Sequence, residues 1–308
     1  MSNPKISIVT ANKNSGHFLR ETIESILAQD FNDFEHIIVD GASTDDSLEI
    51  IKSYPHIRWI SEPDSSALEG FLKAVQMARG KYIMTMSVSD KYMSHTWFRR
   101  CVEVLDADID ISMVWGIGAE MNEEGDIIQL SHPWGPQIRP PQKQDFLPLW
   151  LASNRHAYLP ELNYCVRREV YLKCYLNSQS QEIFPTYDPL LAILFNFHRN
   201  GYLPFFLSIV AHCGRIHDGQ ISRFGQSNNL RRTKIFLRKL CTQYLIDILL
   251  GRKEHFFRNG ESVVIGRLSR SEKMQLPFSI IRSWIDILSN LTFRSGKVRR
   301  SVRILFGG

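Results

Sequence analysis

Cysteine is scarce in this sequence and shows no pattern that would pair it. Five cysteines occur in 308 residues, and none belongs to a Cys-x-x-Cys pair or to an even, closely spaced framework. This distribution argues against a disulfide-rich secreted domain and against a cysteine-based zinc site. It predicts reduced, mostly buried thiols in a cytoplasmic protein. The cysteines are Cys101, Cys165, Cys174, Cys213 and Cys241.

Long apolar runs are lacking as well. No stretch reaches the roughly 18 apolar residues that an ordinary membrane-spanning helix needs. The first residues, MSNPKISIVT, show neither the basic region nor the hydrophobic region of a secretory signal. We therefore expect a cytoplasmic chain that contacts a membrane, if at all, peripherally at its inner face.

Charge is unevenly distributed along the chain. The overall net charge is +5, but from Arg223 onward 18 basic side chains face 5 acidic ones, a net charge of +13. Residues 1–222 hold the remaining 19 basic and 27 acidic side chains, a net charge of −8. An acidic body with a basic tail predicts that the tail meets an anionic surface.

Strand-like and helix-like patterns alternate through the first 130 residues. The β-branched runs Ile6–Thr10 and His36–Asp40 bracket an amphipathic segment, and Lys81–Val88 is typical of a central strand. This alternation predicts an α/β domain, a mostly parallel sheet flanked by helices. Ligands of such sheets bind beyond the carboxyl ends of the strands, where small and polar residues stand here.

The segment from Ile6 to Asp46 resembles the N-terminal module of family 2 glycosyltransferases, which have the GT-A (Rossmann-like) fold. In that family the first strand runs into a Thr-Pro-Asn-type loop, and the second ends in Asp-Gly-(Ser/Ala)-Ser-Thr-Asp. Here Thr10-Ala11-Asn12 and Asp40-Gly41-Ala42-Ser43-Thr44-Asp45 stand at these places. The resemblance implies that Asp40 recognises the donor base and that Thr10 and Asn12 support it. Without that context, Asp40-Gly41 would read as an ordinary turn.

A second match supplies further donor-binding candidates. Ser61-Glu62-Pro63-Asp64 matches the family's Ser-Glu-Pro-Asp motif, which implies that Asp64 helps to hold the nucleoside. The helix that follows departs from the family's Asp-Ala-x-Asn-Lys-Gly pattern, because Leu72 replaces the Asn. Lys73 is retained and is assigned to the donor. Read without the resemblance, the segment is a turn and a helix start.

The metal motif is matched only in part. The family's Leu-Asn-Ser-Asp-Asp-x-Tyr corresponds to Met86–Tyr92, so that Asp90 is the expected ligand of Mg²⁺ or Mn²⁺. Ser89 replaces the preceding acid and is assigned to the donor, so we expect weakened metal binding. The alternative is a polar strand end that caps the next helix. Arg215-Ile216-His217 resembles the family's Arg-x-His element, which makes His217 a second candidate ligand, against the alternative of a structural histidine.

The acceptor half should supply a general base. The family's (Glu/Met)-Asp-Tyr-Asp-Leu-Trp corresponds here to residues 185–190, PTYDPL. Asp188 falls on the second acid and is the candidate catalytic base, with Glu182 in reserve, while Thr186 replaces the first acid. The alternative is that Asp188 caps a helix that starts at Pro189.

Together these motifs predict an inverting, hexosyltransferase-type enzyme that moves a sugar from a nucleoside-diphosphate donor, a UDP-sugar, to a saccharide or lipid-linked acceptor in surface polysaccharide synthesis. Residues 1–222 would form the catalytic domain, with a nucleotide-sugar half (1–130) and an acceptor half (131–222) that opens on a proline-rich segment. Residues 223–308 would form a basic amphipathic helical extension, with no nucleic-acid partner. Its helices would lie on a membrane surface or, as the alternative, pack on the catalytic domain with their charges in solvent.

Two other interpretations compete with this one. The first is an attenuated or non-catalytic relative that binds a nucleotide sugar, suggested by the acids missing at Ser89 and Thr186. The second is a nucleotidyltransferase, which is disfavoured because the loop Ala11–Gly16 has only one Gly and one Lys.

Overall fold

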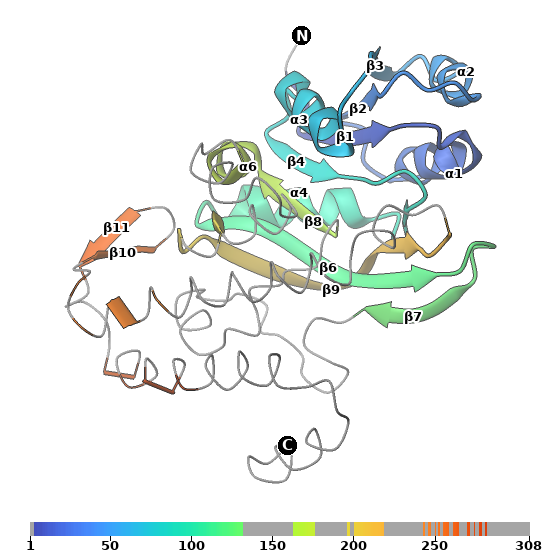
Figure 1. Cartoon of the computed structure of the whole chain (residues 1–308). Helices are drawn as coiled ribbons and strands as arrows, with labels where there is room; N and C mark the ends of the chain where they lie inside the picture. The colour runs from blue at the N-terminus through green and yellow to red at the C-terminus, as the bar shows by residue number, and fades with distance from the viewer. Residues whose placement is uncertain are drawn as a thin grey trace, which may run out of the picture.

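The computed structural model describes residues 3–131, 163–175, 196–197 and 200–218, with scattered positions between 243 and 281. These residues form a nine-stranded mixed sheet with helices on both faces, and a separate two-stranded hairpin (Figure 1). The α/β architecture expected from the sequence is confirmed.

The first half of the chain builds the parallel part of the sheet. β1 (Ile6–Asn12), β2 (Phe34–Asp40), β3 (Ile57–Ser61) and β4 (Tyr82–Thr85) are parallel in the order β3-β2-β1-β4. They are connected through α1 (Gly16–Leu27), α2 (Ser47–Lys52) and α3 (Ala67–Met77). The register places Asn12 opposite Asp40, so β1 and β2 end together at one edge of the sheet.

The second half makes the sheet mixed. β8 (Tyr164–Arg167) lies antiparallel between β4 and β6 (Ile111–Met121), and β7 (Ile127–Ser131) forms a hairpin with β6. β9 (Leu203–Arg215) runs parallel to β6 and antiparallel to the short β5 (Lys91–Tyr92). The expectation of a mostly parallel sheet therefore holds as far as β4. It fails beyond β4, because β5, β7 and β8 all join the sheet antiparallel to their neighbours.

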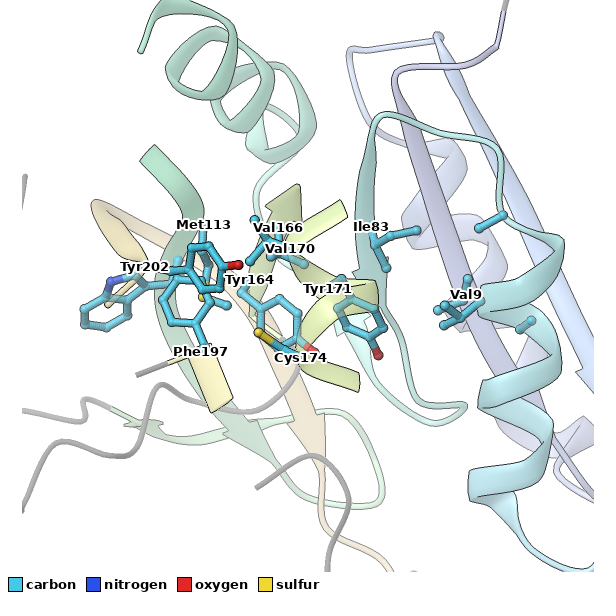
Figure 2. Close-up of a cluster of buried hydrophobic side chains, with 14 of the residues drawn as sticks. Val9, Ile83, Met113, Tyr164, Val166, Val170, Tyr171, Cys174, Phe197 and Tyr202 are labelled. Carbon is cyan, nitrogen blue, oxygen red and sulfur yellow. The ribbon is translucent and has the colours of Figure 1, made fainter. Parts of the chain in front are cut away.

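Two apolar layers cover the sheet. On one face, α3 and α6 (Arg168–Tyr175) pack on Val9, Ile83 and Val166, with Tyr171 and Cys174 fully buried (Figure 2). On the other, α1, α2 and α4 (Trp97–Ala107) cover residues such as Ile8 and Ile38. In α1 the buried residues Leu19, Ile23 and Ile26 recur at helical spacing, which explains why this face of the helix turns inward. Burying these side chains is what holds the strand ends in place.

The described cysteines agree with the sequence expectation, since Cys101, Cys165, Cys174 and Cys213 are free and buried. In the part of the chain that the structure describes, no helix combines the length and apolar character needed to cross a membrane.

The basic extension is only partly described. The two helices expected over residues 231–251 and 278–293 lie almost wholly outside the described residues. An unexpected hairpin is present, in which β10 (His255–Arg258) pairs antiparallel with β11 (Glu261–Val264). Asn259-Gly260 between these strands is a common hairpin signal that could have predicted it.

Candidate functional site

A hydrogen-bonded group of polar side chains closes the ends of β1 and β2. Nδ2 of Asn12 donates to Oδ1 of Asp40 at 2.7 Å, and the backbone N–H of Gly41 donates to the carbonyl of Asn12 at 2.8 Å. Ser43 donates to Asp40 through both its backbone N–H and its hydroxyl, and the Ser61 hydroxyl donates to Oδ2 at 2.7 Å. Asp40 is thus the acceptor at the centre of a fixed loop.

The Asp40 carboxylate is held in its charged form. Burial would raise the pKa of Asp40, but the hydrogen bonds from Ser43, Ser61 and Asn12 outweigh it and bring the pKa below its usual value. Each carboxylate oxygen already accepts two hydrogen bonds, and the residue is fully buried. Asp40 is therefore placed to shape the crevice, and a base could take its oxygens only by displacing one of these donors.

Thr10 does not belong to this group. Its hydroxyl lies 3.1 Å from Nε2 of His36, and both residues are buried in the face of the sheet that α1 and α2 cover. Burial, reinforced by the nearby charge of His56, lowers the pKa of His36 to about 3. His36 is therefore a neutral core residue at physiological pH. Thr10 supports the site only through this buried contact.

Asp64 lies over the ends of β1 and β2. A Cβ on Gly41 would come within 2.6 Å of its Oδ2, and a Cβ on Gly70 would come within 3.4 Å of the same atom. The side chain of Asp64 is 4% exposed, and its Oδ1 lies 3.4 Å from Nζ of Lys13 on the β1–α1 loop. Sequence reasoning did not assign Lys13 to the site. Its position directly after the Thr10-Ala11-Asn12 motif was the available signal.

Lys73 forms ion pairs with two neighbouring glutamates. Its Nζ lies 2.7 Å from Glu62 and 2.8 Å from Glu69, and these two contacts raise its pKa. The same contact with Lys73, with hydrogen bonds from Ser65, lowers the pKa of Glu69 to about 2. Lys73 therefore stabilises the start of α3 through these ion pairs. Its assignment to the donor stays a prediction.

The Ser89-Asp90 turn carries a strained residue. Ser89 has a φ of 93°, one of three positive values among the described non-glycine residues, and it is buried. Oδ1 of Asp90 accepts from the backbone N–H of Arg215 at 3.0 Å and from the Ser89 hydroxyl at 3.3 Å. The Asp90 carbonyl accepts from Thr22 of α1 at 2.8 Å. The turn is thus held by α1 and β9 and by a hydrogen bond within the turn itself.

Two residues of β9, His212 and Arg215, lie close to this turn. The sequence motifs had assigned neither of them a role there. Nε2 of His212 lies 3.2 Å from Oδ2 of Asp90, although no motif had pointed to His212. Arg215 reaches the Ser89 carbonyl at 3.1 Å through its Nε. The pairing of β9 with β5 is what brings them there, since Lys91 stands opposite Cys213. No local sequence signal announces that pairing.

His217 lies near the same turn. Its ring contacts Phe18 of α1 in a tilted arrangement with centroids 4.9 Å apart, and the guanidinium of Arg215 lies 5.0 Å from the centre of the same Phe18 ring. Arg215 and His217, the two residues of the Arg-x-His element, therefore both contact the Phe18 ring.

The donor set here suits a divalent cation only in part. Among the described residues, no three His, Cys, Asp or Glu side chains are grouped so that they could hold a metal ion. Asp90 and His217 could provide two ligands, because Mg²⁺ commonly takes one or two protein ligands and completes its shell with phosphate and water. Both carboxylate oxygens of Asp90 already have partners, Oδ1 in Arg215 and Ser89 and Oδ2 in His212, so a cation site at this turn stays a prediction.

The described candidates form two groups at one edge of the sheet. Asn12, Asp40 and Asp64 gather beyond β1 and β2, while Ser89, Asp90 and His217 gather beyond β4. Since β1 pairs in parallel with both β2 and β4, both groups lie at the carboxyl edge of these strands. Asp188, Glu182 and Thr186 lie outside the described residues, so the general base stays a prediction.

Comparison with known proteins agrees with this arrangement. The sequence model of the family described as "Glycosyl transferase family 2" matches residues 7–158. Chondroitin synthase of Escherichia coli is 27% identical over 135 residues, which cover 42% of this chain and 20% of the synthase. Hyaluronan synthase of Pasteurella multocida is 28% identical over 135 residues, which cover 42% of this chain and 14% of the synthase. The chain thus spans a fifth or less of these two relatives.

A solved structure shares the fold over a longer stretch. The crystal structure of S. aureus TarS 1-349 in complex with UDP-GlcNAc superposes with a TM-score of 0.59 at 13% sequence identity. The superposition covers 92% of this chain and 73% of the TarS chain. The likeness therefore extends beyond the segment that the family model matches.

Proposed function

Because this chain is a family 2 glycosyltransferase with the GT-A fold, we propose that it moves a sugar from a nucleoside-diphosphate donor, a UDP-sugar, to a hydroxyl group of a saccharide or lipid-linked acceptor. The observation that carries the proposal is the fixed group of Asn12, Asp40 and Asp64 at the carboxyl edge of the sheet. It lies inside the matched segment, at the place where open α/β sheets bind nucleotides.

Each residue group has a distinct task in this proposal. Asp64 offers a carboxylate to the nucleoside above the loop that Asp40 holds, and Gly41 and Gly70 leave room for it. Lys13 stands beside Asp64 and can turn toward a phosphate, because its side chain is 55% exposed. Asp90 and His217 would hold a Mg²⁺ or Mn²⁺ ion, which neutralises the charge of the leaving diphosphate when bound.

The transfer itself needs a base on the face of the sugar opposite the diphosphate. The acceptor hydroxyl loses its proton to this base and attacks the anomeric carbon in line, which inverts the configuration there. Asp188 is the proposed base. Asp188→Asn should abolish transfer and leave UDP affinity within about twofold of wild type, with Glu182→Gln as the matched control. Undiminished transfer by Asp188→Asn would move the base elsewhere.

The nature of the donor and the product rests on the relatives. The first donors to test are UDP-sugars, since TarS, which shares the fold, was solved with UDP-GlcNAc. The chondroitin and hyaluronan synthases, which align over 135 residues, support polysaccharide synthesis as the process. A basic, amphipathic segment from residue 223 onward would suit contact with an anionic membrane that carries a lipid-linked acceptor.

A donor screen tests the proposal directly. The protein is incubated with UDP- and GDP-sugars, Mg²⁺ or Mn²⁺ and saccharide acceptors, and release of the nucleoside diphosphate is followed. We expect release from at least one UDP-sugar that depends on acceptor. Nucleotide binding without release under all conditions would favour the alternative of an attenuated binding protein, to which the Ser89 substitution points.

A further inference from the structure

Arg215, the last residue of β9, has a buried side chain that joins three separate parts of the fold. The residue is 2% exposed, and its guanidinium pairs with Glu21, whose side chain is 44% exposed. Its Nε donates to the carbonyl of Ser89 at 3.1 Å, and one terminal nitrogen donates to the carbonyl of Glu123 at 2.6 Å in the β6–β7 turn. Its other terminal nitrogen pairs with Glu21 of α1.

The backbone of Arg215 adds a contact on the same turn. Its N–H donates to Oδ1 of Asp90 at 3.0 Å, so one residue holds Ser89 through its side chain and Asp90 through its main chain. Ser89 has a φ of 93°, a strained conformation that persists only when its surroundings impose it. The Nε bond to its carbonyl is one of the contacts that impose it.

Arg215 also acts on His217 through Phe18. The guanidinium lies 5.0 Å from the centre of the Phe18 ring, and the His217 ring lies 4.9 Å from it. Cation–π and ring contacts of this kind favour one orientation of the aromatic platform. A change in the guanidinium would therefore alter Asp90 and His217 together.

The positive charge of Arg215 is only partly neutralised by its carboxylate partner. Glu21, its carboxylate partner, is 44% exposed and also pairs with Lys91 at 2.7 Å. A buried cation with one exposed, shared counter-ion and several neutral carbonyl acceptors keeps part of its positive potential. The carboxylate of Glu21 therefore helps to hold the guanidinium in its place beside the turn.

We propose that Arg215 is a positioning residue that holds the Ser89-Asp90 turn and His217 in the arrangement that receives the donor diphosphate. The inference rests on the proposed function, because it assigns the diphosphate to this turn. Arg215 acts through Ser89, Asp90 and Phe18 and touches no reacting atom.

The chain offers a matched control for a merely structural role. Arg167 of β8 is also buried, and its guanidinium donates to the carbonyls of Ile111, Leu105 and Asp108 and lies 5.8 Å from the centre of the Tyr82 ring. It stands where β4 and β6 begin, whereas Arg215 stands where they end. Arg167→Lys and Arg215→Lys therefore disturb similar bonding at opposite ends of the sheet.

The test compares the thermal midpoint and UDP affinity of both variants with wild type, using isothermal titration with and without Mg²⁺. We expect both variants to lose stability, but only Arg215→Lys to weaken UDP binding, by about tenfold or more in the presence of Mg²⁺. If Arg215→Lys fails to fold, Glu21→Gln replaces it, because Glu21 is half exposed and its loss frees the guanidinium. That variant should weaken UDP binding severalfold.

Three outcomes are decisive. Selective weakening in Arg215→Lys, or in Glu21→Gln where that variant takes its place, supports a positioning role. The positioning role is overturned if the variant tested binds UDP with wild-type affinity. It is also overturned if Arg167→Lys weakens UDP binding equally. A wild-type chain that binds neither UDP nor GDP would refute the proposed function itself, and the inference with it.

Discussion

Nδ2 of Asn12 donates a 2.7 Å hydrogen bond to Oδ1 of Asp40, and this bond ties together the last residues of two parallel strands. The two residues are 28 positions apart in sequence, with α1 between them. Because Asn12 and Asp40 are paired in register, the bond fixes where both loops leave the sheet. The start of both loops therefore depends on a buried contact.

Asp40→Asn should damage both the fold and the site. The amide would present N–H groups where Asn12, Ser43 and Ser61 already donate, so at least one donor would lose its acceptor. Leaving such a group unsatisfied costs about 1–3 kcal/mol. Urea unfolding should show a loss of this size, and titration should show weaker UDP binding. Asp106→Asn, at the opposite end of the strands, should lower stability without affecting UDP; equal UDP affinities in the two variants would contradict the assignment.

Gly41→Ala should displace Asp64. The added methyl carbon would lie 2.6–2.8 Å from the three carboxyl-group atoms of Asp64, closer than such contacts permit. We expect at least tenfold weaker UDP binding with a modest change in thermal midpoint. Gly214→Ala is the control, because its methyl group would meet nothing nearer than 3.8 Å. UDP titration of both variants decides the matter, and retained affinity in Gly41→Ala would remove Asp64 from the site.

His36 should make stability depend on pH. Burial lowers its pKa from 6.5 to about 3, so the unfolded chain binds a proton below pH 6.5 that the folded chain does not. Stability is therefore complete above pH 6.5 and is lost as the pH falls toward 3, by about 2 kcal/mol between pH 6.5 and 4.5 at 1.36 kcal/mol per unit. Urea unfolding across this range should show the slope.

Two substitutions test whether His36 is the source of this pH dependence of stability. His36→Gln keeps a polar partner for Thr10 but cannot take up the proton, so its stability should vary less between pH 6.5 and 4.5. Thr10→Val keeps the imidazole and should retain the wild-type slope at lower overall stability. Identical slopes in His36→Gln and wild type would show that other groups carry the pH dependence.

Asp90→Ala should abolish transfer and remove the effect of Mg²⁺ on UDP binding. The substitution deletes the proposed ligand and also the acceptor for the Arg215 backbone N–H, so a loss of about 1–3 kcal/mol in stability should accompany it. Donor turnover and UDP titration with and without Mg²⁺ measure both effects. Asp110→Ala, an exposed acid at the start of β6, is the control. Turnover of the donor at the wild-type rate would disprove the metal assignment.

Local pattern was enough to predict that Asn12 and Asp40 lie together at one edge of the sheet. Asn12 and Asp40 end consecutive strands of one strand–helix–strand unit, and parallel pairing of such strands brings their ends together. The side-chain partners were harder to foresee. Thr10 and Lys73 carry the expected residue types, but Thr10 faces His36 and Lys73 faces Glu62 and Glu69. Their orientation depends on packing, which a motif does not specify.

The contacts around Asp90 could not be predicted from spacing. Arg215 lies 125 positions away from Asp90, and the two meet because β9 inserts between β6 and β5. The same insertion brings His212 to Asp90, and it depends on the register Lys91 to Cys213. Such long-range pairing has no local sequence signature, because loop closure over that distance is decided by the whole sheet.

The places of β8 and β9 in the sheet have a practical consequence for anyone who shortens this protein. The family match ends at residue 158, yet a fragment cut there would omit β8 and β9, exposing the flanks of β4 and β6 to aggregation. It would also leave the Asp90 carboxylate without its main-chain donor. Expression trials that trim the C-terminal side should retain every residue through 218.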